Sequence, residues 1–140
     1  MKLFLDANVV FSAAHQPEGR AQHLLALARA GYCSLVTSAH ALEEARRNLA
    51  LKSSGYEARL DGALAIIGSA PEAPSSLVEW AASHGLPPRD APILAAEAHC
   101  RADLLVTGDA RDFGSLFGRV FRGVKVVTPA QALEAVLSGR

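Results

Sequence analysis

The feature of the sequence that most constrains its fold is the alternation of short apolar runs with segments of helical spacing. Four continuous apolar runs have the length and composition of buried strands, at residues 3–5, 33–37, 103–107 and 124–127. Between and after them, helical composition and spacing mark residues 21–30, 38–51, 55–68, 75–84, 90–100 and 129–137. Because strands that are apolar throughout need cover on both faces, this pattern predicts an α/β fold around a central parallel sheet.

The remaining segments complete the predicted organisation. Residues 12–19 contain Pro17 and Gly19 and are predicted to form a loop. The 140 residues contain no internal repeat and no interdomain linker, so we expect a single domain that spans residues 1–140.

The composition argues against several classes of protein. Basic and acidic side chains balance at zero net charge, so nucleic-acid binding must use a local basic patch. Cys33 and Cys100 are too few and too far apart for a disulfide framework or a zinc site, which favours reduced thiols in an intracellular, cytoplasmic protein. Asp6 interrupts the apolar start too early for a signal peptide, and no apolar run approaches the roughly 18 residues of a membrane span.

Acidic residues follow two of the predicted strands. Asp6 comes directly after the first strand, and Asp109 follows Gly108 at the end of the third. In parallel α/β sheets, the carboxyl ends of the strands form the edge at which ligands bind. If the backbone stays extended, the side chains of Asp6 and Asn8 point to the same side of the strand. The alternative is that these two residues form a turn or a helix cap. A third acid, Asp90, precedes an Ala-Pro dipeptide, a helix-start pattern, so a helix N-cap is its alternative role.

The fourth candidate acid is one of two adjacent glutamates, Glu43 and Glu44, in the helix predicted after Ser38. At about 100° per residue, Glu44 lies nearer the edge of the apolar face of this helix. Glu43 has arginines at i+3 and i+4, a typical solvated pairing. We therefore predict Glu44 at the boundary of the core, where a site residue would lie, and Glu43 on the surface.

Acids gathered at one edge of a sheet repel one another unless a cation neutralises them. The four candidates are all carboxylates, and the five histidines have no metal-ligand spacing. Such an oxygen donor set suits hard divalent cations, so we predict Mg²⁺ or Mn²⁺ as the cofactor. Sites of this kind act on phosphate esters, because the metal activates water and stabilises the attacking and leaving oxygens.

These residues resemble the motifs of the PIN-domain nucleases, and among them the toxin-like, VapC-related members. The resemblance covers nearly the whole chain. It is carried by LDANV at residues 5–9, Ser38 with ALEEARRNL at residues 41–49, DAPILAA at residues 90–96 and ADLLVTGD at residues 102–109. No single motif is specific for this family, but the presence of all four in this order and at these spacings is strongly specific for it.

The resemblance implies a three-layer α/β/α fold with a central parallel sheet and the activity of a metal-dependent endoribonuclease. Its catalytic and metal-binding acids map onto Asp6, Glu44, Asp90 and Asp109. The family's helix acid lies six positions after the serine, which again selects Glu44. Accessory positions of the site map onto Asn8, Thr107 and Asp112.

The resemblance also implies a toxin of a toxin–antitoxin pair, with RNA as substrate and a cognate antitoxin as partner. Together with the high apolar fraction, it favours a homodimer, and no membrane partner is expected. A local phosphate-binding rim would come from arginines near the site, namely Arg20, Arg46, Arg47, Arg89 and Arg111.

Other functions stay open at the level of the sequence. A phosphatase with Asp6 as nucleophile is disfavoured, because haloacid-dehalogenase-type enzymes carry a second Asp where Asn8 stands. A PIN-fold RNA-processing nuclease without an antitoxin is one alternative. A non-catalytic module that binds RNA or a partner is another, and the complete set of acids argues against it.

Overall fold

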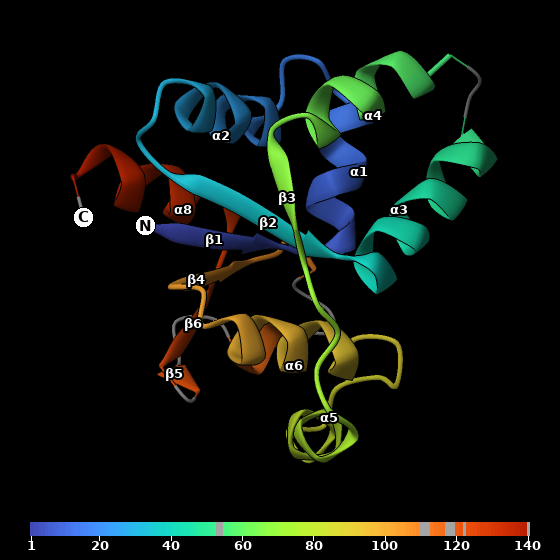
Figure 1. Ribbon diagram of the computed structural model, residues 1–140, viewed down its shortest axis with the longest axis vertical. Coiled ribbons are helices and arrows are strands. Elements are labelled where there is room, and N and C mark those ends of the chain that lie inside the picture. Colours follow the sequence, from blue (N-terminus) through green and yellow to red (C-terminus); the bar gives the residue numbers. More distant parts are fainter. Residues whose placement is uncertain (53–54, 110–112, 117–119, 122, 140) are drawn as a thin grey trace.

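The computed structural model describes residues 1–52, 55–109, 113–116, 120–121 and 123–139, and Figure 1 shows a sheet between two groups of helices. In chain order the elements are β1 (Lys2–Leu5), α1 (Ala7–His15), α2 (Arg20–Arg29), β2 (Ser34–Ser38), α3 (Ala39–Lys52), α4 (Glu57–Leu64), β3 (Ile67–Ala70), α5 (Ser75–Ala82), α6 (Ala91–Cys100), β4 (Leu104–Val106), the 3₁₀ helix η1 (Gly114–Leu116), β5 (Val120–Phe121), β6 (Val124–Val127) and α8 (Pro129–Leu137).

The sheet has the strand order β3-β2-β1-β4-β6-β5. Its first five strands in this order run parallel, which confirms the predicted parallel sheet, and β5 pairs with β6 in the antiparallel direction. The chain moves outward from β1 to β3 and then returns to place β4 on the other side of β1. Such a reversal of strand order creates a crevice at the carboxyl ends of β1 and β4, where ligands bind in open α/β sheets.

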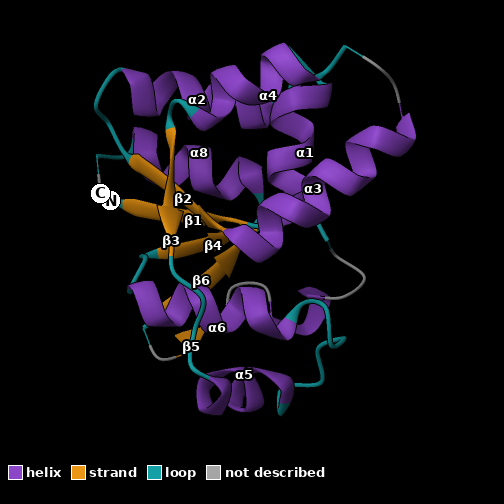
Figure 2. Cartoon of the chain, turned by 45° about the vertical axis from the view of Figure 1, so that its right-hand side comes forward, coloured by secondary structure: helices purple, strands orange, loops and turns teal. Residues whose placement is uncertain are grey.

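Side chains alternate between the two faces of the strands and so build two cores. Leu3 and Leu5 face a core shared with α1, α2, α4 and α8, whereas Phe4 faces a core shared with α5 and α6. Figures 1 and 2 show the same division of these helices between the two sides of the sheet. The helix α3 packs beside α1. The three-layer α/β/α fold is therefore confirmed.

The loop predicted at residues 12–19 is wrong for its first half, because α1 continues to His15. The Asp6 carboxylate accepts a hydrogen bond from the backbone N–H of Ala7 and caps this helix. Its buried residues recur at helical spacing and include Val9, Val10, Ala13 and Ala14. The proline and glycine of this segment mark only the short connection at residues 16–19.

The helix predicted at residues 55–68 is too long. The helix α4 ends at Leu64, and Ile67 begins β3, which pairs with β2 along residues 67–70. The apolar residues of this segment have helical spacing, but pairing with β2 is a tertiary interaction that local spacing does not contain. The other predicted helices and strands agree with the structure to within a few residues at each end.

Within the described ranges, none of the helices has the length and apolar character needed to cross a membrane.

Candidate metal centre

The acidic candidates lie around the carboxyl ends of the two central strands. The strands β1 and β4 pair directly, with Leu5 opposite Val106. The backbone N–H of Asp6 donates to the Val106 carbonyl at 3.0 Å, so the pairing extends to the first residue after β1. Asp6 and Thr107 therefore leave neighbouring strands at the same edge of the sheet.

The side chains of Asp6 and Asn8 lie close together, but the backbone between them is not extended, which was one of the two conformations expected from the sequence. Asp6 is the N-cap of α1, and Asn8 lies in the first turn of that helix. The helix-cap alternative is therefore the observed one. The two side chains still contact each other, because Asn8 Nδ2 donates to Asp6 Oδ2 over 3.1 Å. One oxygen of Asp6 caps the helix while the other faces the end of β4.

Hydrogen bonds from the segment after β4 hold the Asp6 carboxylate in place. Thr107 Oγ1 donates to Asp6 Oδ2 at 2.6 Å. The same hydroxyl oxygen accepts from Asn8 Nδ2 at 3.2 Å and from the backbone N–H of Asp109 at 3.1 Å. The backbone N–H of Gly108 donates to Asn8 Oδ1 at 2.9 Å. Thr107 and Asn8 thus join β4 to α1 and orient Asp6.

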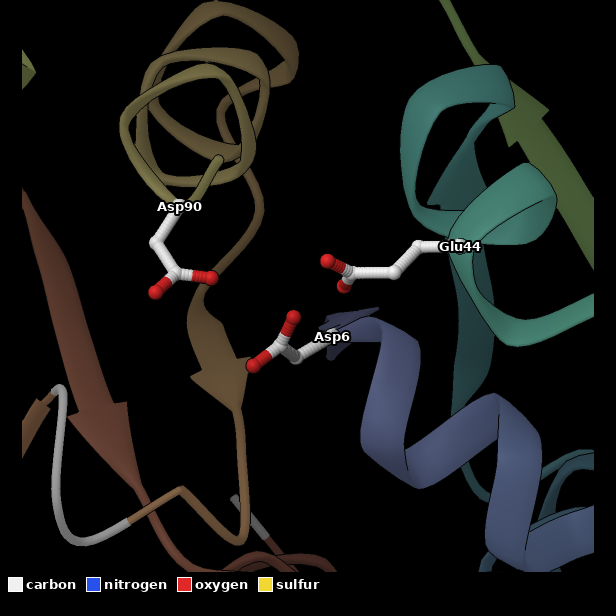
Figure 3. A group of neighbouring side chains, drawn as sticks. All are labelled: Asp6, Glu44 and Asp90. Carbon is white, nitrogen blue, oxygen red and sulfur yellow. The ribbon is translucent and has the colours of Figure 1, made fainter. Parts of the chain in front are cut away.

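Glu44 and Asp90 bring two further carboxylates to Asp6, as Figure 3 shows. Glu44 projects from α3 and Asp90 from the residue before α6, and ligand atoms of the three side chains lie within 4.8 Å of one another. Glu43 is exposed on α3, whereas Glu44 is partly buried. This placement agrees with the helical-face argument, and Glu44 is the glutamate that joins the group.

Asp90 has only 3 % of its surface exposed. It occupies the N-cap position of α6, but its side chain makes no capping hydrogen bond. Its Oδ2 lies 3.9 Å from Nε of Arg89, whose side chain is 60 % exposed. His40 Nε2 bonds to the carbonyl of Arg89 at 2.8 Å and ties the start of α3 to the segment that carries Asp90. A capping role therefore does not account for this buried carboxylate.

The environment of Asp6 disfavours its negative charge. Burial is the largest cause that raises the pKa of Asp6 from 3.8 to about 6. The charges of Glu44 and Asp109 raise the pKa further, whereas hydrogen bonds from Thr107 and the backbone of Ala7 lower it. A bound cation would relieve this unfavourable electrostatic environment.

The three carboxylates border a cavity of about 310 Å³. Asn48 also lines it, four residues after Glu44. Sequence reasoning did not single out Asn48, although its i+4 spacing from Glu44 places it on the same helix face. Clustered carboxylate oxygens, supplemented by an amide oxygen, are the donors that Mg²⁺ and Mn²⁺ prefer, so the residues present fit the predicted cofactor.

The structure places the fourth predicted acid at the border of this site. Asp109 is partly buried and lines the same cavity, but it is not one of the three side chains within 4.8 Å of one another. Asp112, the predicted additional acid, lies outside the described residues.

The arginines predicted to form a rim occupy different places. Arg89 lines the acidic cavity, and Arg20 lines a second cavity beside it. Arg46 and Arg47 are exposed on α3 and line neither cavity. Arg111 lies outside the described residues.

Comparison with known families identifies the chain. A family model described as PIN domain matches residues 2–111, and the protein therefore belongs to the PIN domain family. The matched segment includes all four predicted acids. No curated protein matches the chain.

Solved structures share the fold at low sequence identity. VapBC2 from Rickettsia felis, bound to a DNA fragment from its promoter, superimposes with a TM-score of 0.70 at 16 % identity, covering 91 % of this chain and 98 % of that chain. PAE2754 from Pyrobaculum aerophilum gives a TM-score of 0.66 at 16 % identity over 99 % of both chains. FitAcB from Neisseria gonorrhoeae gives a TM-score of 0.57 at 20 % identity, covering 91 % of this chain and 98 % of that chain. At sequence identities this low, the structural similarity establishes that these proteins share the fold.

Proposed function

We propose that the protein is an endoribonuclease that hydrolyses RNA phosphodiester bonds with Mg²⁺ or Mn²⁺. The observation that carries the proposal is the convergence of Asp6, Glu44 and Asp90 at the carboxyl edge of the two central strands. Membership of the PIN domain family supports it, because the segment that the family model matches contains each of these residues.

In this proposal Asp6, Glu44 and Asp90 hold the cation, and Asp109 completes the site at its border. A bound Mg²⁺ or Mn²⁺ would supply a water of lowered pKa and positive charge for the phosphate oxygens. Thr107 keeps the Asp6 carboxylate oriented through its 2.6 Å hydrogen bond. A carboxylate held in advance needs little reorganisation when metal and substrate arrive.

The test is cleavage of a structured RNA by the purified protein with Mg²⁺, with Mn²⁺ or with excess EDTA. Cleavage is expected with either ion and not in EDTA. Asp6→Asn should abolish cleavage. The matched control is Asp61→Asn, which removes the same charge from an exposed position on α4 and should cleave at the wild-type rate. Undiminished cleavage in EDTA, or by Asp6→Asn, would overturn the proposal.

We further propose that the protein is the toxin of a toxin–antitoxin pair, acts in the cytoplasm as a homodimer and binds a cognate antitoxin. The resemblance to VapC-related toxins supports this role, as does the structural likeness to VapBC2 and FitAcB. The hydrophobic fraction of 50 % is consistent with an apolar surface between two copies.

The toxin role has a test of its own. Expression of the chain in a bacterial host should arrest growth, and Asp6→Asn should not. Co-expression of the proposed cognate antitoxin should restore growth. Growth arrest by Asp6→Asn, or normal growth with the wild type, would contradict the toxin role, while the cleavage assay would still decide the nuclease activity.

A further inference from the structure

A second cavity, of about 430 Å³, lies beside the acidic cavity. It is formed between α1 and the start of α2, and Pro129 at the start of α8 also lines it. Asn8 and Asp109 line both cavities, so the two adjoin along these side chains. The site proposed for cleavage therefore has a neighbouring cavity to which no role has been given.

The lining of the second cavity combines apolar and polar groups. Val9 and Ala21 contribute buried apolar surface. Ser12, Gln16 and Arg20 contribute a hydroxyl, an amide and a guanidinium. A nucleotide presents matching groups, because it has an apolar base face, hydrogen-bonding base and sugar atoms, and a phosphate. The volume falls within the range of ~300–1,000 Å³ that ligand pockets occupy.

Tertiary contacts hold the walls of this cavity in a defined arrangement. The side-chain amide of Gln22 donates to the carbonyl of Ala13 and ties α2 to α1. The backbone N–H of Gly19 donates to the Gln16 carbonyl at 3.2 Å and closes the connection between the two helices. The cavity is therefore bounded by two packed helices and a hydrogen-bonded turn.

The positive charge of Arg20 suits this residue to bind a phosphate group. The chain has zero net charge, so phosphate binding depends on individual cations near the site. Arg20 is exposed and, among the residues that the structure describes, forms no ion pair. An RNA strand whose phosphodiester lies at the acidic centre continues into a neighbouring nucleotide. Arg20 lines the cavity that this nucleotide would reach past Asn8 and Asp109.

We propose that the second cavity binds the nucleotide next to the scissile phosphodiester. Arg20 pairs with the phosphate of that nucleotide, and Ser12 and Gln16 hydrogen-bond to its ribose or base. The inference rests on the proposed function, since it takes the acidic cavity as the place of cleavage. It assigns Arg20, one of the arginines predicted to form a phosphate-binding rim, to the phosphate of one particular nucleotide.

Steady-state cleavage of a single-stranded RNA with Mg²⁺ tests the inference in Arg20→Ala and in a matched control, Arg29→Ala. Both variants remove one positive charge from α2, but Arg29 lies at the other end of that helix and does not line the cavity. Arg20→Ala should raise KM about ten- to a hundredfold with a smaller change in kcat, as loss of one charge-assisted contact predicts. Arg29→Ala should stay close to the wild type, and Arg20→Lys should recover part of the loss.

The salt dependence of binding gives a second readout that does not depend on turnover. Binding of a short fluorescein-labelled single-stranded RNA is followed by anisotropy with Ca²⁺ in place of Mg²⁺. The slope of the logarithm of the binding constant against the logarithm of salt concentration should shrink by about 0.7 in Arg20→Ala, the value for one lost phosphate contact to a single strand. The slope for Arg29→Ala should equal that of the wild type.

The outcomes separate this inference from the proposed function. If the wild type cleaves RNA but Arg20→Ala and Arg29→Ala have equal KM and equal salt slopes, the second cavity is not a nucleotide site and the nuclease proposal stands. If the wild type does not cleave RNA but the salt slope falls only in Arg20→Ala, the cavity binds nucleotides and the nuclease proposal fails. If the wild type neither cleaves nor binds RNA, both proposals are overturned.

Discussion

Replacement of Glu97 by glutamine should stabilise the protein at neutral pH. Glu97 lies on α6 with 0 % of its surface exposed. Neither of its carboxyl oxygens has a hydrogen-bond partner among the residues that the structure describes. Its helix is buried almost all round, and Ile93, Leu94 and Ala96 beside it are also buried. An ionised carboxylate in such a place would be far less stable than in water.

Burial is the largest cause that raises the pKa of Glu97 from 4.5 to about 9, and the negative charge of Asp103 adds to it. The folded protein therefore keeps Glu97 protonated at neutral pH, while the unfolded chain releases this proton above pH 4.5. Since the folded state binds the extra proton between pH 4.5 and about 9, the free energy of unfolding falls as pH rises through this window.

The magnitude follows from the same shift. Within the window, the contribution of Glu97 to the free energy of unfolding falls by about 1.4 kcal/mol for each pH unit. Between pH 5 and pH 7 the loss is therefore about 3 kcal/mol, against a total stability of ~5–15 kcal/mol for a typical domain. Glu97→Gln keeps the shape and polarity of the protonated acid but does not titrate, so this loss should be absent from the variant.

Urea unfolding of the wild type and Glu97→Gln at pH 5, 6 and 7 measures the effect. The two proteins should have similar stability at pH 5, and the variant should be more stable by about 3 kcal/mol at pH 7. Glu79→Gln, at an exposed position on α5, is the control and should follow the wild type across the range. If the difference between the wild type and Glu97→Gln is the same at all three pH values, Glu97 is not held protonated and the argument from burial is refuted.

The proposed site gives four further predictions. The melting temperature of the wild type should rise with added Mg²⁺ or Mn²⁺, by the linkage between binding and folding, and that of Asp6→Asn should rise much less in the same thermal scans. Glu44→Gln should abolish RNA cleavage while Glu43→Gln keeps most of it, and the opposite result would show that the exposed glutamate is the functional one. Asp90→Asn keeps the size of the side chain and breaks no capping hydrogen bond, so it should melt within a few degrees of the wild type but lose cleavage, whereas cleavage near the wild-type rate would make Asp90 only a structural residue. Thr107→Val removes the hydroxyl that donates to Asp6, and urea unfolding should show a loss of about 1–3 kcal/mol that Thr107→Ser largely avoids.

The order of helices and strands was largely predictable, because most of these elements are specified by local patterns. The apolar runs that become β1, β2, β4 and β6 were recognised from their composition, and β4 in particular is buried along its whole length. The strand β3 was missed because its residues continue the helical spacing of α4 and become a strand only by pairing with β2. The helix α1 was missed because a proline and a glycine after it extended the predicted loop too far toward the N-terminus.

The acids of the candidate site were also chosen from local sequence patterns, but those patterns could not show that the acids lie close together in the fold. Residues 6, 44 and 90 are brought within reach of one another because β1 lies between β2 and β4 and because α3 and α6 begin at the same edge of the sheet. The contact between Asp6 and Asn8 was expected from an extended backbone and instead arises from a helix cap. In both cases the geometry came from elements distant in sequence or from a different local conformation.

The sequence alone determined the α/β class, the parallel sheet, the set of candidate acids and the preference for Glu44 over Glu43. Each of these depends on residue type and on spacing within one element, which short-range sterics and the period of a helix or strand specify. Only the tertiary structure decided that three acids converge while Asp109 stays at the border, and that Thr107 holds Asp6. It also decided that Arg20 lines a second cavity and that Glu97 is buried with no hydrogen-bond partner in the described part of the chain. These features depend on which surfaces face each other after packing, and no spacing within a single helix or strand specifies that.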